Sequence, residues 1–181
     1  MKRDRKLYKI AVAAVIGAVY AVLTIVLAPI SFGPLQFRIS EVLCILPFFF
    51  SGAAPGLFIG CVIANLIGSG EVFDIVFGSL ATLLAAVCTA AIGSKAWKRE
   101  VISWGRCIAA CAMPVLFNAP IIGAVLSGIN TPTEFWEGFV LFGGMVGLGE
   151  LAVLFVLGLP LMRYMLKNDK IMVFFAKLRN T

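Results

Sequence analysis

Long apolar runs separated by short polar segments dominate the chain, and they predict an all-α membrane protein. The six runs cover residues 10–28, 39–54, 55–67, 74–92, 103–126 and 137–165. A run of about 20 apolar residues is long enough to cross a bilayer as a helix. The second and third runs are shorter. Pro55, which lies among small residues between them, predicts a break between two tilted helices rather than one long helix.

The composition agrees with a single integral membrane domain covering residues 1–181. Hydrophobic residues make up 61% of the chain and charged residues 13%, which leaves too little polar surface to cover a water-soluble globule. The first run is too long for the apolar part of a signal peptide, so we expect it to be retained. Residues 166–181 are predicted to form a cytoplasmic tail, with an amphipathic helix over residues 171–179 at the membrane surface.

The positions of the basic residues predict the topology. Of 15 Lys and Arg residues, all except Arg38 lie in clusters at 2–9, 95–106 and 163–179. With six spans, the three clusters fall on one face, which the positive-inside rule assigns to the cytoplasm, so both termini are expected there. With five spans, the middle cluster would face outward. Because the clusters flank apolar spans, the net charge of +6 does not indicate nucleic-acid binding.

Several patterns on which enzymes depend are missing from the sequence. It contains no histidine, which excludes a His-based metal site, a His general base and a Ser-His-Asp triad. It also contains no GxxxxGK[ST] phosphate-binding loop. The five cysteines lie inside apolar runs without a CxxC pair, so packing is their expected role. We therefore expect neither an enzyme nor a cofactor, and any ATP-driven function must use ATPases on other chains.

Polar side chains next to and inside the apolar runs are the candidate binding residues. Arg38 and Glu41 lie just before an apolar run, where they could also pair with each other on one helical turn. Asn65, Asn118 and Glu150 lie inside apolar runs, where an unpaired polar group is costly. A structural alternative for Asn118 and Glu150 is that they pair across the bundle. Asn118 could also bond to a carbonyl freed by the nearby proline.

Carboxylates and aromatic side chains gather at the predicted outer ends of the helices. Besides Glu41, Glu71 and Asp74, the carboxylates include Glu134 and Glu137, for which solvated helix termini are an equal alternative. Aromatic rings together with carboxylates suit a flat, guanine-like heterocycle that carries an amine. One carboxylate would accept from adjacent ring and exocyclic N–H groups, and another would pair with the ammonium. An arginine or amide could donate to the ring carbonyl.

Rows of small residues mark two of the predicted helices. In the first run, small residues recur every four positions at Ala14 and Ala18, and at Ala13, Gly17 and Ala21. Such rows let helix backbones approach closely, either within one bundle or against a partner chain. A similar row in the last run, Gly143 and Gly147, is assigned to packing.

Three strings carry a resemblance to a known family. They are LAPISFGPLQFRISEVLCILPFFF at 27–50, PGLFIGCVIANLIGSGEVFDIVFGSLATLLAA at 55–86 and FNAPIIGAVLSG at 117–128. Through them the chain resembles the QueT family, substrate-binding S components of energy-coupling factor (ECF) transporters that are assigned to queuosine precursors. The resemblance extends over nearly the whole chain, and QFRISE and FDIVFGSLAT are its specific motifs.

The resemblance implies a multi-pass cell membrane protein with six helices. It would capture a deazaguanine from outside and join a transmembrane scaffold subunit that carries two ATPase subunits. The implied substrate is 7-aminomethyl-7-deazaguanine, its nitrile precursor or queuine, which differ at one substituent. The scaffold would dock on the small residues of the first helix: Ala13, Ala14, Gly17, Ala18 and Ala21.

The resemblance also implies that substrate contacts come from the loop after the first helix, the loop before the fourth helix and the outer halves of the last three helices. The positions that could serve are Gln36, Arg38, Glu41, Asn65, Glu71, Asp74, Asn118 and Glu150. From the chemistry of the ligand, Glu41 and Asp74 are the first expected carboxylate contacts, followed by Glu71 and Glu150.

Two other functions fit the apolar pattern. A membrane scaffold or assembly protein would explain the small residues but less well the outer polar ones. A small autonomous transporter without ATPase partners would need a polar path to the inner face, whereas the deep polar groups are sparse.

Overall fold

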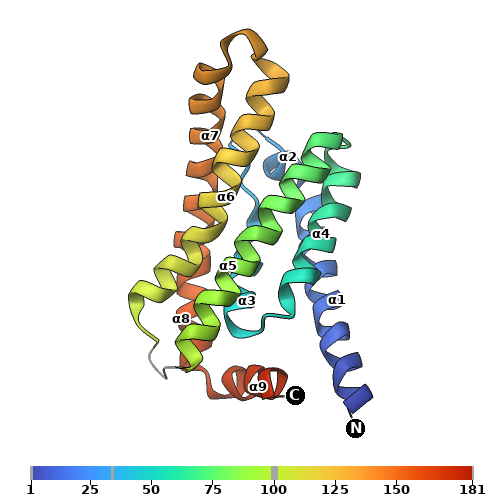
Figure 1. Cartoon of the computed structure of the whole chain (residues 1–181), viewed down its shortest axis with the longest axis vertical. Helices are drawn as coiled ribbons and strands as arrows, with labels where there is room; N and C mark the ends of the chain where they lie inside the picture. The colour runs from blue at the N-terminus through green and yellow to red at the C-terminus, as the bar shows by residue number, and fades with distance from the viewer. Residues whose placement is uncertain (1, 34, 99–101, 181) are drawn as a thin grey trace.

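Figure 1 shows a computed structural model of the protein, which describes residues 2–33, 35–98 and 102–180. Every regular element in these ranges is helical. Pro34, in the segment before Glu41, and residues 99–101, in the middle basic cluster, lie outside the described residues.

The elements follow one another along the chain as a bundle of long helices interrupted by short ones. In order they are α1 (Lys2–Val26), α2 (Ala28–Ser31), η1 (Ile39–Ile45), α3 (Leu46–Phe49), α4 (Ala53–Gly68), η2 (Asp74–Gly78), α5 (Ser79–Lys98), α6 (Trp104–Asn130), η3 (Pro132–Glu134), α7 (Phe135–Ala152), η4 (Val153–Gly158), α8 (Leu159–Lys167) and α9 (Asp169–Asn180). The helix predicted for the carboxyl tail is present as α9.

Four helical stretches in the described part of the chain are long and apolar enough to cross a membrane. They are Lys6–Val26, Asp74–Lys98, Trp104–Asn130 and Pro132–Lys167. Two shorter apolar stretches, Ile39–Phe49 and Ala53–Gly68, lie between the first and second of these. The all-helical prediction is therefore confirmed. A total of six membrane crossings and a cytoplasmic position for both termini stay predictions.

The break between the two short stretches lies earlier than the sequence pattern places it. Helix α3 ends at Phe49 and α4 begins at Ala53, so residues 50–52 form the connection. Pro55 is the third residue of α4. It is tolerated there because the amide groups of the first helical turn have no partner within the helix, so the missing N–H costs little.

Glycines allow two pairs of helices to approach closely. Gly17 of α1 faces Gly56 and Gly60 of α4, and an added Cβ at any of the three would meet backbone atoms of the other helix. In the same way, Gly123 of α6 lies against Gly143 of α7, which confirms the packing role assigned to that row. These contacts fix α1 against α4 and α6 against α7.

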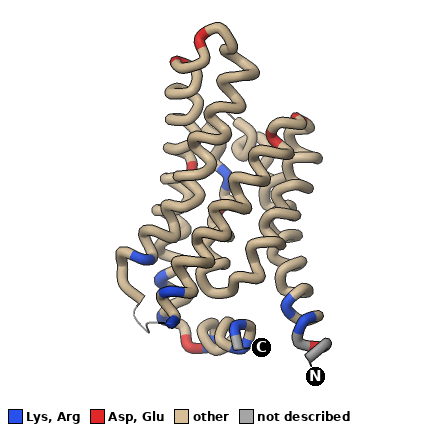
Figure 2. The backbone as a smooth tube through the Cα atoms, in the orientation of Figure 1, with Lys and Arg blue, Asp and Glu red and all other residues tan. Residues whose placement is uncertain are grey.

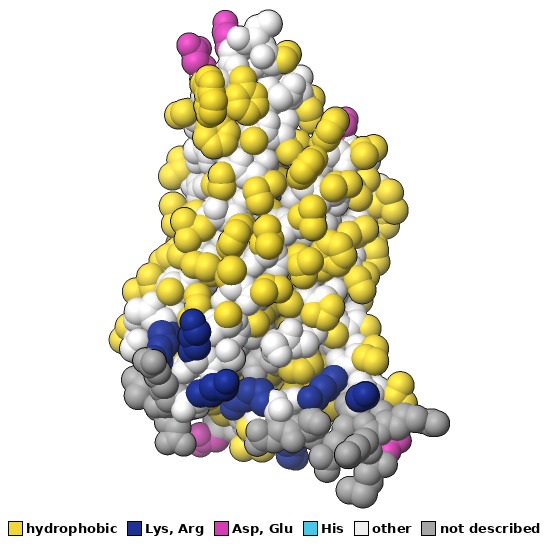
Figure 3. Space-filling view, viewed as in Figure 1, with side chains coloured by type: hydrophobic (Ala, Val, Ile, Leu, Met, Phe, Trp, Pro, Cys, Tyr) yellow, Lys and Arg dark blue, Asp and Glu magenta, His cyan; other side chains and the backbone are white. Residues whose placement is uncertain are grey.

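The two ends of the bundle differ in chemistry. Both termini lie at one end, where α9 crosses the bundle and buries Phe175 and Leu178 in the apolar core. Basic residues gather at this end (Figure 2). Apolar side chains cover most of the length of the face seen in Figure 3, between the basic end and the opposite end. This distribution suits a protein whose middle lies in lipid and whose ends lie in water.

Candidate binding site

A network of polar side chains is buried between the apolar helices. Arg38 is 5% exposed, Glu41 is fully buried and Glu150 is 2% exposed, and Asn65 and Asn118 are buried with them. A buried charge is costly unless hydrogen bonds or opposite charges compensate it, so these side chains must be held by specific partners. We refer to these five residues and the side chains bonded to them as the polar network.

The segment between α2 and η1 carries Arg38 into the bundle. Gln36 in this segment has a φ of 43° and is buried. The backbone of the segment lies directly against Gly149 of α7, where an added Cβ would meet the carbonyl of Leu35. This segment thus packs against α7, and the glycine that it contacts immediately precedes Glu150.

The guanidinium of Arg38 has partners on two sides and one open donor. Its Nη2 donates to the side-chain oxygen of Asn65, and its Nη1 lies 3.9 Å from the Sγ of Cys61. The guanidinium carbon lies 5.0 Å from the centre of the Phe32 ring, a cation–π contact. The third nitrogen, Nε, is buried and has no hydrogen-bond partner among the described residues.

Glu41 is held by donors from two other positions rather than by Arg38. The Tyr20 hydroxyl of α1 donates to Oε1, and the Cys44 thiol donates to Oε2 at 2.9 Å. Next to this contact, the hydroxyls of Thr24 and Ser40 are 2.6 Å apart. Arg38 interacts electrostatically with Glu41, but the hydrogen bonds of the two side chains go to other residues, so the alternative of a directly bonded pair on one helical turn is wrong. Both oxygens of Glu41 are therefore already occupied by protein donors.

Asn65 connects α4 to the start of the next long helix. Its side-chain nitrogen donates to the backbone oxygen of Asp74 at 2.9 Å, while its oxygen accepts from Arg38. The Cys61 sulfur, one turn earlier, accepts from the Thr82 hydroxyl of α5 at 3.4 Å. The network thus reaches from α1 through η1 and α4 to α5.

Glu150 and Asn118 form the second part of the network. The side-chain nitrogen of Asn118 on α6 donates to Oε1 of Glu150 on α7 at 2.8 Å. This is the pairing across the bundle expected from the sequence as the structural alternative for these two residues. The other oxygen, Oε2, is buried and has no partner among the described residues. The carboxyl also interacts electrostatically with Glu41 and Arg38, which places the two parts of the network in one region.

The remaining carboxylate candidates have side chains that are less buried than the polar network. Glu71 is exposed and Asp74 is half-buried. Asp74 joins the network through its backbone oxygen. Glu134 and Glu137 are exposed near the far end of α6 and α7, in agreement with solvated helix termini.

Six polar or sulfur-bearing side chains in and next to the network were not among the candidates identified from the sequence: Tyr20, Thr24, Ser40, Cys44, Cys61 and Thr82. Tyr20 and Thr24 are four residues apart in an otherwise apolar run, so they share a helix face, and that spacing was the available signal. The assignment of the cysteines to packing alone is incomplete for Cys44 and Cys61, whose sulfur atoms take part in hydrogen bonds.

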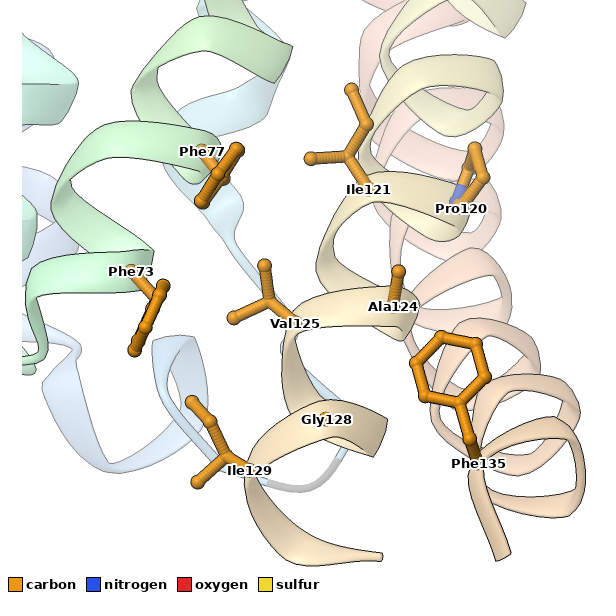
Figure 4. Close-up of a pocket in the computed structure, with 9 residues that line it drawn as sticks. All are labelled: Phe73, Phe77, Pro120, Ile121, Ala124, Val125, Gly128, Ile129 and Phe135. Atoms are coloured by element: carbon orange, nitrogen blue, oxygen red, sulfur yellow. The ribbon is translucent and has the colours of Figure 1, made fainter. Parts of the chain in front are cut away.

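The predicted aromatic lining is divided between two places. Phe32 contacts Arg38, whereas Phe77 and Phe135 line a separate groove of about 580 Å³ beside α6. Figure 4 shows only apolar side chains and Gly128 around this groove. Because it offers no polar side chain, the groove does not suit recognition of a hydrogen-bonding heterocycle.

The small residues of α1 fall on two different faces. Gly17 and Ala21 are buried, and Gly17 contacts α4, which is the internal-packing alternative for this row. Ala14 and Ala18 are exposed. Ala13 is half-buried, and its carbonyl lies against Gly56. Of the five positions predicted to dock a scaffold, Ala14 and Ala18 are therefore the two that the folded bundle leaves exposed.

Comparisons with known proteins relate this arrangement to one family. The family described as QueT transporter matches residues 10–167, which include every residue of the polar network. A protein named queuosine precursor transporter QueT, from Lactococcus lactis subsp. cremoris (strain MG1363), is 30% identical over 158 residues. The match covers 86% of this chain and 90% of that relative. No solved structure matches the chain.

The bond between Tyr20 and Glu41 yields a prediction for stability. Tyr20→Phe removes the hydroxyl and leaves a buried carboxylate oxygen without its donor, which we expect to cost about 1–3 kcal/mol of unfolding free energy. Tyr8→Phe is the matched control, because Tyr8 is an exposed tyrosine on the same helix. Thermal unfolding of the detergent-solubilised proteins measures the difference. Equal melting temperatures for the two variants would contradict the network.

Proposed function

The chain belongs to the QueT transporter family, and on that premise we propose that it binds a queuosine precursor for uptake into the cell. It is a multi-pass protein of the cell membrane. In the proposed function it is the substrate-specific subunit of an ECF-type importer, and separate subunits provide the scaffold and the ATPases. The polar network is the proposed substrate site.

One observation carries the choice of site. Among the described residues, the Nε of Arg38 is a buried donor without a partner, and Oε2 of Glu150 is a buried acceptor without a partner. Leaving such groups unsatisfied costs about 1–3 kcal/mol each, and more for charged groups. A bound ligand that accepts from Arg38 and donates to Glu150 would recover this energy.

A deazaguanine has the groups that these two open positions require. Its ring carbonyl accepts a hydrogen bond, and the neighbouring ring N–H and exocyclic amine donate hydrogen bonds. In the proposed complex, Glu150 accepts from the N–H edge and Arg38 donates to the carbonyl. Asn118 fixes the Glu150 carboxyl through the other oxygen, so the open oxygen has a defined position.

The roles proposed for the other carboxylates differ from the order expected from sequence. Both oxygens of Glu41 are occupied, so Glu41 supports the network rather than touching the ligand first. Asp74 is half-buried and interacts electrostatically with Arg38, so it stays the candidate partner for the ammonium of the aminomethyl substrate. An ammonium would gain from this carboxylate, and an uncharged nitrile would not.

The proposed assembly uses the exposed face of α1. Ala14 and Ala18 lie on it, together with the exposed side chains of Val15 and Val22. Small side chains on a membrane helix allow another helix to approach its backbone closely. The tight contact of Gly17 with α4 supports a docking role for the exposed face of α1. It would hold α1 in place while the scaffold subunit binds to that face.

The first test replaces the open carboxylate. Glu150→Gln keeps an oxygen that can accept from Asn118 but replaces the open acceptor oxygen with an amide nitrogen, which can only donate, and we expect deazaguanine binding to weaken by roughly ten- to a hundredfold. Glu137→Gln, at an exposed position on the same helix, should bind like the unchanged protein. Isothermal titration calorimetry on the detergent-purified proteins gives both values. Undiminished binding by a folded Glu150→Gln protein would move the site elsewhere.

The second test addresses assembly with ECF subunits. Ala14→Trp places a large side chain on the exposed face of α1 and should prevent co-purification with the scaffold and ATPase subunits while leaving ligand binding intact. Leu148→Trp provides the control, because Leu148 is 63% exposed on a different helix. If Ala14→Trp assembles as well as Leu148→Trp does, the docking face is not on this side of α1. If the unchanged chain binds no deazaguanine and still assembles, a scaffold role replaces the proposed transport role.

A further inference from the structure

A small pocket at the end of the bundle that carries both termini has a different chemistry from the polar network. It has a volume of about 170 Å³ and is lined by residues of α1, α3, α5, α9 and the connection between α3 and α4. Two cations, Lys9 and Arg179, and two hydroxyls, Ser51 and Ser94, contribute to its lining. No acidic residue is among the lining residues that the structure describes.

Arg179 is held in a fixed position at this pocket. Its guanidinium carbon lies 3.6 Å from the centre of the Trp97 ring, and the indole nitrogen of Trp97 donates to the backbone oxygen of Phe48 at 2.9 Å. This cation–π contact holds the guanidinium over the ring. Its Nη1 is buried and has no hydrogen-bond partner among the described residues. Partial burial also lowers the pKa of Arg179 below its ordinary value, a cost that an adjacent anion would offset.

We propose that this pocket binds the phosphate group of an anionic membrane phospholipid. The two cations and the Ser51 hydroxyl match the charge and the acceptor oxygens of a phosphate diester, while the Ser94 hydroxyl donates to the backbone oxygen of Ala91. The rest of the lining is largely apolar and aromatic, including Pro47 and Phe50, which suits the glycerol and upper acyl region of a lipid better than free phosphate. Basic pockets between membrane helices on the cytoplasmic side are a known setting for lipid headgroups.

The headgroup must carry a net negative charge. The ammonium of a zwitterionic headgroup would need a carboxylate or an open aromatic face, whereas the guanidinium of Arg179 covers a face of Trp97. Bound lipid would join α1, α5 and α9, because Lys9, Ser94 and Arg179 come from these three helices. This inference does not depend on the proposed substrate site.

The test measures lipid binding to the full chain. Native mass spectrometry of the detergent-solubilised protein follows titration with dioleoylphosphatidylglycerol or dioleoylphosphatidylcholine. We expect preferential binding of phosphatidylglycerol. Lys9→Gln and Arg179→Gln should each weaken it roughly fivefold, and the double variant roughly twenty-five-fold. Lys170→Gln removes an exposed cation from α9 outside the pocket and should leave binding unchanged.

Three results would overturn the proposal. Equal binding of the two lipids would show that no anionic headgroup is selected. An equal loss in Lys170→Gln and in the pocket variants would show only a general effect of charge. Displacement of phosphatidylglycerol from the pocket by inorganic phosphate would identify a free-phosphate site instead. If Arg179→Gln disturbs the packing of α9, the loss of phosphatidylglycerol binding in Lys9→Gln still tests the proposal, because Lys9 lies on a different helix.

Discussion

The burial of Arg38 in an apolar bundle is the constraint on which much of this structure depends. A guanidinium cannot lose its charge in a protein, so the fold must bring hydrogen-bond acceptors and opposite charge to it. Asn65 supplies an acceptor and is itself fixed by the backbone of Asp74. Glu41, Asp74 and Glu150 interact electrostatically with Arg38 in the same region. The positions of α4, η2 and η1 are thereby coupled to one side chain.

Helix α1 links the two proposed binding surfaces. Its inward face contributes Tyr20 and Thr24 to the contacts around Glu41, and Ala14 and Ala18 are exposed. Close contact of Gly17 with α4 restricts rotation of α1 about its axis. A rearrangement around Glu41 would therefore displace the exposed face as well, since both belong to one helix that is held tightly on one side.

The sequence predicted the chemistry of the site better than its contacts. Polar groups at membrane depth are costly, so Asn65, Asn118 and Glu150 could be identified as important, and the pairing of the last two could be anticipated. The spacing of Arg38 and Glu41 suggested a pair on one helical turn. That argument fails because Arg38 precedes η1 in an extended conformation, with φ of −84° and ψ of 90°. Helical spacing does not apply there.

The partners that went unpredicted share a physical cause. Tyr20 and Glu41 are 21 residues apart, so their contact depends on how α1 is rotated against η1, which packing decides. The inward fold of the segment around Gln36 likewise depends on the open space at Gly149, far along the chain. The long helices, by contrast, were predicted well, because each of them follows from a local apolar run. The prediction of helix boundaries was least reliable at Pro55. A proline is tolerated throughout the first turn of a helix, so its position does not fix the residue at which the helix begins.

The most direct measurement of the central claim compares two ligands on the unchanged protein. Calorimetric titration with 7-aminomethyl-7-deazaguanine and with the same compound lacking the exocyclic 2-amino group isolates the donor edge proposed to meet Glu150. The account predicts that removal of the amino group weakens binding by roughly ten- to a hundredfold, because the open carboxylate oxygen then loses a charge-assisted hydrogen bond. Equal affinity for the two compounds would contradict it.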